Sequence, residues 1–271
     1  ADRLQFSHPG LTAKQKTRDP KPLEAGPQPV DNSFVVPIAS DVPPGVYDVR
    51  TISKFGISNP RSFVVGDLNE TQETEPNNTM EAATEVPLGV INARCGGAAD
   101  VDWYKFTAKA GQRLVLDCLA QRIDSPVDAT LVLCDAKGNQ IDSNRDTNRR
   151  DPLIDFKVPT DGMYYVKLYD FIYAGGGDYV YRLQISDQPY IDFVIPTAAA
   201  PGSKTQFEVF GRNLPGGKPS GEQIDGQPLE KVTVTINVPS GEAAHQVDTS
   251  GYVTSSDSWI DGFQYQIKGS S

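Results

Sequence analysis

The sequence lacks the residues from which most hydrolytic centres are built. Its 271 residues include only two histidines, His8 and His245, and these fall in different predicted domains. A nucleophilic serine or cysteine needs a base placed beside it, so a catalytic triad is not expected. The sequence also has no H-E-x-x-H helix, no G-x-S-x-G elbow and no Walker phosphate loop. We therefore predict that the chain is not an enzyme and has no catalytic residue.

Cysteine is almost as scarce. Cys95, Cys118 and Cys134 are too few for a disulfide framework, and their odd number leaves at least one thiol free or paired elsewhere. Cys118 and Cys134 lie in apolar runs typical of strands, where small buried thiols are common. We interpret them as core residues.

Long apolar runs and an excess of positive charge are also missing. No run approaches the roughly 20 apolar residues that cross a bilayer, so no membrane span is predicted. The chain has 35 acidic and 25 basic residues, a net charge of −10. A phosphate backbone would repel such a chain, so nucleic acid is not an expected partner.

Residues typical of strands and tight turns are abundant, with 21 prolines, 24 glycines and 11 tyrosines. Val232, Val234 and Ile236 alternate with polar residues, which predicts a half-buried strand. The segment "PTDGMYYVKLYD" at 159–170 has the same period after a turn signal. We predict an all-β protein, with one modest helix candidate at 78–86. The Gly-rich "YAGGGDY" at 173–179 is interpreted as a hairpin.

Two polar stretches divide the chain. The acidic segment 66–78 interrupts the apolar pattern, and "SDQPY" at 186–190 precedes a new series of strands and turns. The predicted domains are residues 1–70, 71–188 and 189–271.

The middle segment carries "ETEPNNT" at 73–79, "DVDWYKFTAKAGQRLVLDC" at 100–118 and "DATLVLCDAKGN" at 128–139. Together with "PTDGMYYVKLYD" these resemble the bacterial pre-peptidase C-terminal domain. The resemblance implies a non-catalytic β-sandwich of jelly-roll type, attached to secreted peptidases and other extracellular proteins. The flanking segments 43–65 and 196–217 resemble parts of immunoglobulin-like domains, the second of the transcription-factor-like (IPT/TIG) type. The expected fold is therefore a jelly-roll-like β-sandwich flanked by immunoglobulin-like β-sandwich segments, which we expect to be truncated.

The same resemblance implies a calcium site, because collagen-binding relatives hold calcium between such a linker and an acidic turn. Calcium is coordinated by oxygen atoms of carboxylates, amides and backbone carbonyls. In the alternative reading, "EPNN" begins the domain, its amides satisfy turn groups and the acids are solvated. The matching residues are Glu73, Glu75, Asn77, Asn78, Asp100 and Asp102.

Aromatic residues between 165 and 181 are the remaining binding candidates, since exposed tyrosine offers rigid contact area. A mixture of core and scattered surface residues is the alternative. The predicted function is a non-catalytic binding or accessory module of a larger secreted or cell-surface bacterial protein, stabilised by calcium. Its expected partner is an extracellular protein or polysaccharide. A structural spacer and an accessory region of a secreted hydrolase are the alternatives.

Overall fold

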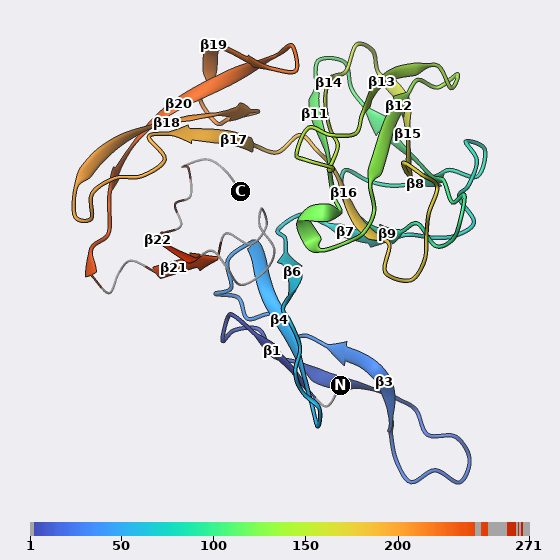
Figure 1. The fold of residues 1–271 in the computed structure, drawn as a ribbon. Helices are drawn as coiled ribbons and strands as arrows, with labels where there is room; N and C mark the ends of the chain where they lie inside the picture. Colours follow the sequence, from blue (N-terminus) through green and yellow to red (C-terminus); the bar gives the residue numbers. More distant parts are fainter. Residues whose placement is uncertain (1–2, 242–244, 249–258, 264, 266, 268–271) are drawn as a thin grey trace. The chain divides into compact units, whose positions relative to one another are not determined.

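A computed structural model describes residues 3–241, 245–248, 259–263, 265 and 267 (Figure 1). Within these residues every regular element is a strand, apart from the 3-10 helix Gln121–Ile123. The all-β prediction is therefore confirmed. Contacts group the chain into two compact units. The first comprises Ala1–Asp67, Arg122–Asp124 and Asp248–Ile260, and the second comprises Leu68–Gln121, Ser125–Val247 and Asp261–Ser271.

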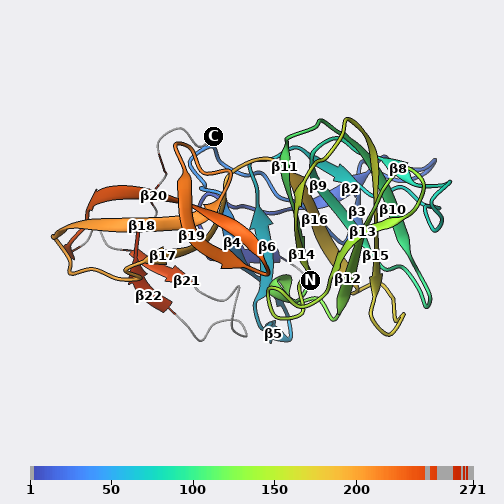
Figure 2. The same cartoon turned by 90° about the horizontal axis from the view of Figure 1, so that it is seen from above.

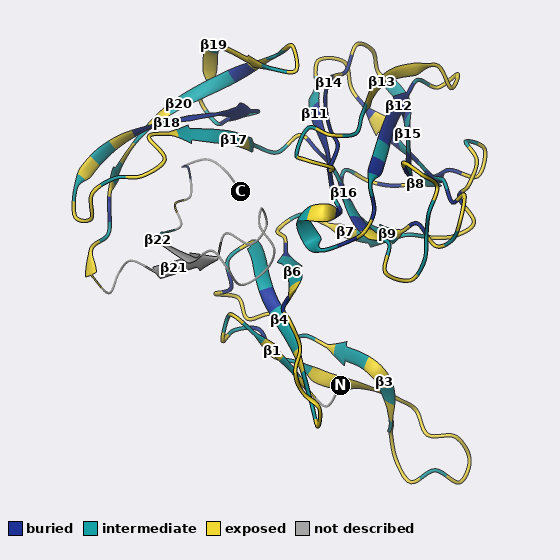
Figure 3. Ribbon diagram, viewed as in Figure 1, coloured by how far each residue is buried: buried dark blue, intermediate teal, exposed yellow. Residues whose placement is uncertain are grey.

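The first unit has a thin core. Strand β4 (Gly45–Ser53) pairs with β1 (Arg3–Phe6), β5 (Gly56–Ile57) and β6 (Arg61–Val65), while β2 (Lys14–Arg18) and β3 (Gln28–Val35) form a separate ribbon. Every residue of β2 is exposed, and Figure 3 shows how little of this hairpin is buried. The buried cluster consists of Leu11, Val42 and Val65 with four partly buried neighbours.

The second unit contains a sandwich of two five-stranded sheets, whose layers are seen from above in Figure 2. In the first sheet the order is β14 (Leu153–Lys157), β11 (Arg113–Leu119), β16 (Val180–Ser186), β9 (Gly89–Arg94) and β7 (Glu70–Gln72). In the second sheet the order is β13 (Gln140–Asn144), β12 (Ala129–Cys134), β15 (Gly162–Asp170), β10 (Asp102–Ala108) and β8 (Thr84–Glu85).

Period-two alternation forms the core between these sheets. Tyr164, Val166 and Leu168 of β15 point inward and are at most 4% exposed, while the residues between them are partly exposed. Leu114 and Leu116 of β11 meet them from the opposite sheet in one buried cluster. Side chains of alternate residues lie on one face of a strand, so the sequence pattern determines which of them are buried.

Two local predictions were wrong. Residues 78–86 form turns and the short strand β8, and no helix, because β8 pairs with β10 and the backbone follows that sheet edge. The glycine-rich segment 173–179 is not a hairpin, since β15 and β16 belong to different sheets. A β-carbon on Gly175 would lie 2.0 Å from the carbonyl oxygen of Gly97, so this crossing requires glycine.

A third sheet in the second unit has the order β17 (Tyr190–Ile195), β18 (Lys204–Arg212), β20 (Gln227–Asn237) and β19 (Lys218–Ile224). Strands β21 (His245–Asp248) and β22 (Trp259–Gly262) form a small ribbon. Val232, Val234 and Ile236 are partly buried while Thr233 and Thr235 are exposed, which confirms the alternation predicted for β20. The immunoglobulin-like character and the three-domain division stay predictions.

Candidate metal centre

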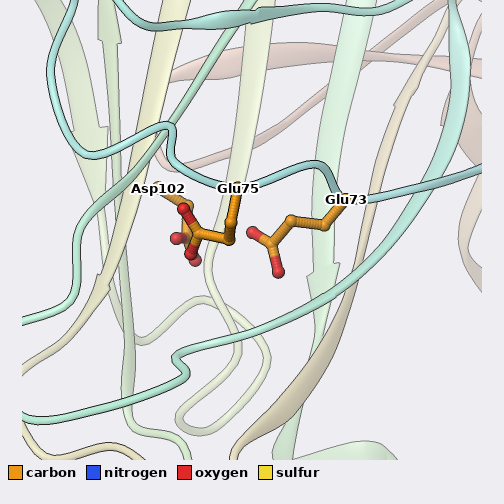
Figure 4. A group of neighbouring side chains, drawn as sticks. All are labelled: Glu73, Glu75 and Asp102. Carbon is orange, nitrogen blue, oxygen red and sulfur yellow. The ribbon is translucent and has the colours of Figure 1, made fainter.

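The linker before the sandwich core lies beside the start of β10. After β7, the Glu73 amide donates to the Asn92 carbonyl of β9 at 3.0 Å, and the Trp103 amide donates to the Asn77 carbonyl at 2.9 Å. These two bonds hold residues 73–77 alongside Asp102, the first residue of β10. Carboxylate oxygens of Glu73, Glu75 and Asp102 consequently lie within 4.8 Å of one another (Figure 4).

Asn77 binds both glutamates of this acidic cluster and is completely buried. Its backbone amide donates to Glu75 Oε2 at 2.8 Å, and its side-chain amide donates to Glu73 Oε1 at 3.3 Å. Glu73 also accepts from the Arg94 backbone amide through Oε2. Asn77 therefore orients both glutamates of the linker.

Two buried tyrosines connect the two sides of the cluster. The Tyr181 hydroxyl lies 2.6 Å from Asp102 Oδ2, the Tyr104 hydroxyl lies 2.7 Å from that of Tyr181, and Tyr104 donates to Glu73 Oε1 at 2.7 Å. Each of these three hydrogen bonds needs one donated hydrogen. The hydroxyls of Tyr104 and Tyr181 supply only two. The chain of hydrogen bonds is complete only when one carboxyl is protonated.

The pKa values agree with that proton count. Burial raises the pKa of Asp102 to about 8, and the negative charges of Glu73, Asp100 and Glu75 add to the effect. Burial also raises the pKa of Glu75, with further contributions from Asp100 and Glu73. Negative charge on Asp102 and on Glu75 is therefore disfavoured in the folded chain.

Two buried oxygens in this cluster have no hydrogen-bond donor. Asn77 Oδ1 and Asp102 Oδ1 are both inaccessible to solvent and unpartnered among the described residues. Buried polar atoms are nearly always satisfied, so such a pair beside convergent carboxylates needs an explanation. Amide and carboxylate oxygens are ligands that calcium prefers, so each of these two atoms is chemically suited to bind a cation.

The other two predicted ligands form a neighbouring pair. The Asn78 side-chain amide donates to Asp100 Oδ1 at 2.7 Å, and the Gly96 backbone amide donates to Asp100 Oδ2. Both Asp100 oxygens are therefore occupied by hydrogen bonds. Of the six predicted residues, Glu73, Glu75, Asn77 and Asp102 converge, while Asn78 and Asp100 bind each other.

Sequence reasoning did not identify Tyr104 and Tyr181 as part of this cluster. The signal was present, because both occupy inward positions of alternating strands where phenylalanine would suffice. A buried tyrosine hydroxyl usually has a polar partner. Which partner it finds depends on the packing of the two sheets.

A second feature lies on the outer face of the β13–β12–β15–β10–β8 sheet. Trp103 of β10 pairs with Lys167 of β15, whose ammonium group lies 5.5 Å from the Trp103 ring and 5.7 Å from the Tyr169 ring. Tyr169 stacks on Tyr173 with ring centroids 5.0 Å apart. The Arg145 guanidinium lies 3.8 Å from the Phe171 ring.

This aromatic face continues into an exposed loop tip. Phe171, Ile172 and Tyr173 are 50%, 76% and 49% exposed. Tyr181, by contrast, is buried in the core, so the predicted tyrosine cluster divides between core and surface. We use the term aromatic face for Trp103, Arg145, Lys167, Tyr169, Phe171, Ile172 and Tyr173.

The groups most suited to nucleophilic chemistry are placed unfavourably. All three cysteines are buried, and burial raises the pKa of Cys95 and Cys134, which disfavours the reactive thiolate. His8 lies in the first unit, where its Nδ1 accepts from the Gly10 amide at 3.0 Å. The side chain of His245 lies outside the described residues.

Comparison with known proteins confirms the resemblance in the central segment. Residues 100–170 match the family model described as the bacterial pre-peptidase C-terminal domain. A probable subtilase-type serine protease of Deinococcus radiodurans is 34% identical over 135 residues. That match covers 48% of this chain and 18% of the protease, so the chain spans about a fifth of the length of this relative.

Two solved structures are similar at low identity. The pre-peptidase C-terminal domain of a collagenase from Bacillus anthracis is 19% identical with a TM-score of 0.33, covering 42% of this chain and all of that one. A periplasmic inhibitor of g-type lysozyme from Aeromonas hydrophila is 18% identical with a TM-score of 0.31, covering 38% of this chain and 96% of that one. Within the described residues no helix is long and apolar enough to cross a membrane.

Proposed function

We propose that this chain, which contains a bacterial pre-peptidase C-terminal domain, is a non-catalytic accessory region of a larger secreted or cell-surface protein. The domain match at residues 100–170 supports the accessory role. The similarity to a probable serine protease, of which the chain covers 18%, favours a peptidase as the rest of the protein. A domain match alone does not identify a ligand, whereas the chemistry of the exposed surface indicates which kind of ligand could bind.

The aromatic face is the proposed binding surface, and its exposed tip is the observation that carries this proposal. Phe171, Ile172 and Tyr173 are consecutive and at least 49% exposed. Rigid aromatic groups beside cations suit an extended polypeptide or polysaccharide, because they offer apolar area and hydrogen-bond donors together. A spacer would need no such surface.

A sedimentation assay with insoluble polymers tests this role. The intact chain is mixed with insoluble collagen, elastin, chitin and peptidoglycan, and the bound fraction is measured. We expect binding to one polymer that is lost in the double variant Phe171→Ala and Tyr173→Ala. Phe55→Ala is the matched control, because Phe55 is 88% exposed but belongs to the first unit. Failure to bind any of these polymers would favour the spacer function.

The acidic cluster is the proposed calcium site. The oxygen ligands would come from Glu73, Glu75, Asn77 and Asp102. The hydrogen-bonded pair Asn78 and Asp100 would lie beside these ligands. Three convergent carboxylates and two unsatisfied buried oxygens support this assignment. Bound calcium would stabilise the linker against β10. Thermal unfolding with calcium and with chelator tests it, since a cation bound only by the folded chain raises the unfolding midpoint.

A further inference from the structure

The outer face of β11 and β14 is buried although it points away from the sandwich core. Leu114 and Leu116 of β11 belong to the core cluster, so Val115 between them lies on the opposite face. Val115 is nevertheless only 1% exposed, and Asp155, its antiparallel partner on β14, is 7% exposed. An outer sheet face normally meets solvent, so another part of the chain must cover this one.

Arg212 of β18 reaches this face from the β17–β20 sheet. It is 1% exposed, and it is the largest fully buried side chain among the described residues. Its Nε donates to Asp155 Oδ2 of the sandwich at 2.7 Å, and its Nη1 donates to Asp192 Oδ1 of β17 at 2.7 Å. One guanidinium therefore joins a carboxylate of each sheet.

Arg113 of β11 makes the reciprocal connection. Its Nε donates to Asp155 Oδ1 at 2.8 Å, and its Nη2 donates to the Pro228 carbonyl of β20 at 2.7 Å. The Asn213 side-chain amide donates back to the Arg113 carbonyl at 2.8 Å. Asp155 thus accepts hydrogen bonds from both arginines, Arg113 of the sandwich and Arg212 of the β17–β20 sheet.

We propose that the β17–β20 sheet is docked rigidly on the outer face of β11 and β14, and that Arg212 holds the two sheets in one orientation. A buried arginine between two carboxylates tolerates little displacement, because each lost hydrogen bond leaves a buried charge unpaired. The planar guanidinium also fixes the directions of its bonds. The sandwich and the following sheet therefore move together, and the proposed calcium site and aromatic face are carried at a fixed angle to β17–β20.

Residual dipolar couplings of the intact chain test this rigidity. Backbone amide couplings are measured in a weakly aligning medium for β9–β16 and for β17–β20. We expect both sets to fit one alignment tensor in the wild type and two different tensors in Asp155→Asn and Arg212→Leu. Lys231→Met is the control, because the Lys231–Glu208 pair lies within the β17–β20 sheet and is partly exposed.

Amide chemical shifts show whether each sheet of a variant remains folded. If Arg212→Leu unfolds its own sheet, Asp155→Asn decides the outcome, because that change is isosteric and lies in the sandwich. Two tensors in the wild type would overturn the rigid junction. One shared tensor in a folded Asp155→Asn variant and in a folded Arg212→Leu variant would overturn the role of Arg212.

Discussion

Two groups of acids in the second unit, each with at least one buried carboxylate, are stabilised in different ways. Asp155 and Asp192 bind arginine side chains, with Arg212 at 2.7 Å from each. Glu73, Glu75 and Asp102 instead meet an amide, two tyrosine hydroxyls and one another. A buried carboxylate needs a cation or a proton. The first group obtains its cation from the chain, whereas Asp102, the buried member of the second group, must take a cation from solution or retain a proton.

The largest effect is expected where the arginine is removed. Arg212→Leu leaves Asp192 buried without its cation, and breaking such a buried group costs about 3–5 kcal/mol of unfolding free energy. Urea unfolding followed by fluorescence measures it. A loss below about 1 kcal/mol, the range of exposed ion pairs, would show that this group is no better paired than a surface one.

Calcium should act on the acidic cluster alone. At a hundredfold excess over its dissociation constant, calcium is expected to stabilise the fold by about 2.7 kcal/mol. Glu75→Gln should abolish most of this gain, because it removes one carboxylate charge from the site.

Glu85→Gln is the matched control, since Glu85 is an exposed acid on the neighbouring strand β8. Differential scanning calorimetry with calcium and with chelator provides the measurement. Equal midpoints in the two solutions would show that the cluster does not bind calcium at that concentration.

The acidic cluster should also give the second unit its own pH dependence. The folded pKa of Asp102 is about 8, far above the unfolded value, so the folded state retains a proton that the unfolded state has lost. Without calcium, stability should therefore fall as pH rises from about 4 to 8, by at most about 1.4 kcal/mol per pH unit.

Asp102→Asn should flatten this slope, because an amide does not titrate. Unfolding midpoints in chelator at several pH values test it. A slope that persists in the variant would assign the titration to another group.

A smaller effect is expected from the tyrosine chain. Tyr104→Phe removes one hydroxyl between Glu73 and Tyr181 and should cost about 1–3 kcal/mol, because two buried polar groups lose a partner. Tyr164→Phe is a useful comparison, since the Tyr164 hydroxyl bonds the Thr160 carbonyl outside the cluster. Only Tyr104→Phe should also weaken the stabilisation by calcium, as measured by calorimetry.

Much of the fold followed from local pattern. The inward residues of β15 and β20 alternate with outward ones as predicted, because strand geometry places every second side chain on one face. The helix predicted at 78–86 was wrong because its local sequence signal was weak. Pairing of β8 with β10 determined the backbone conformation there instead. The hairpin predicted at 173–179 was wrong because the sequence does not show which sheet the next strand joins.

The candidate site was predicted in part. The acids of the linker and of the β10 turn were grouped through family resemblance, and Glu73, Glu75 and Asp102 do converge. Whether they bind calcium stays a proposal. The tyrosines were missed, because Tyr181 meets Asp102 across 79 residues of sequence.

The sequence by itself determined the strand pattern, the excess of negative charge and the candidate acids, because these depend on composition and on short-range period. Only the tertiary structure decided which buried acids form an ion pair with an arginine side chain. Asp155 and Asp102 are both buried aspartates on strands, and nothing near either one in sequence distinguishes them. Asp155 meets Arg212 across 57 residues, whereas Asp102 meets a tyrosine. The difference arises from how the sheets pack, since the electrostatic energy of a buried charge depends on its neighbours in space.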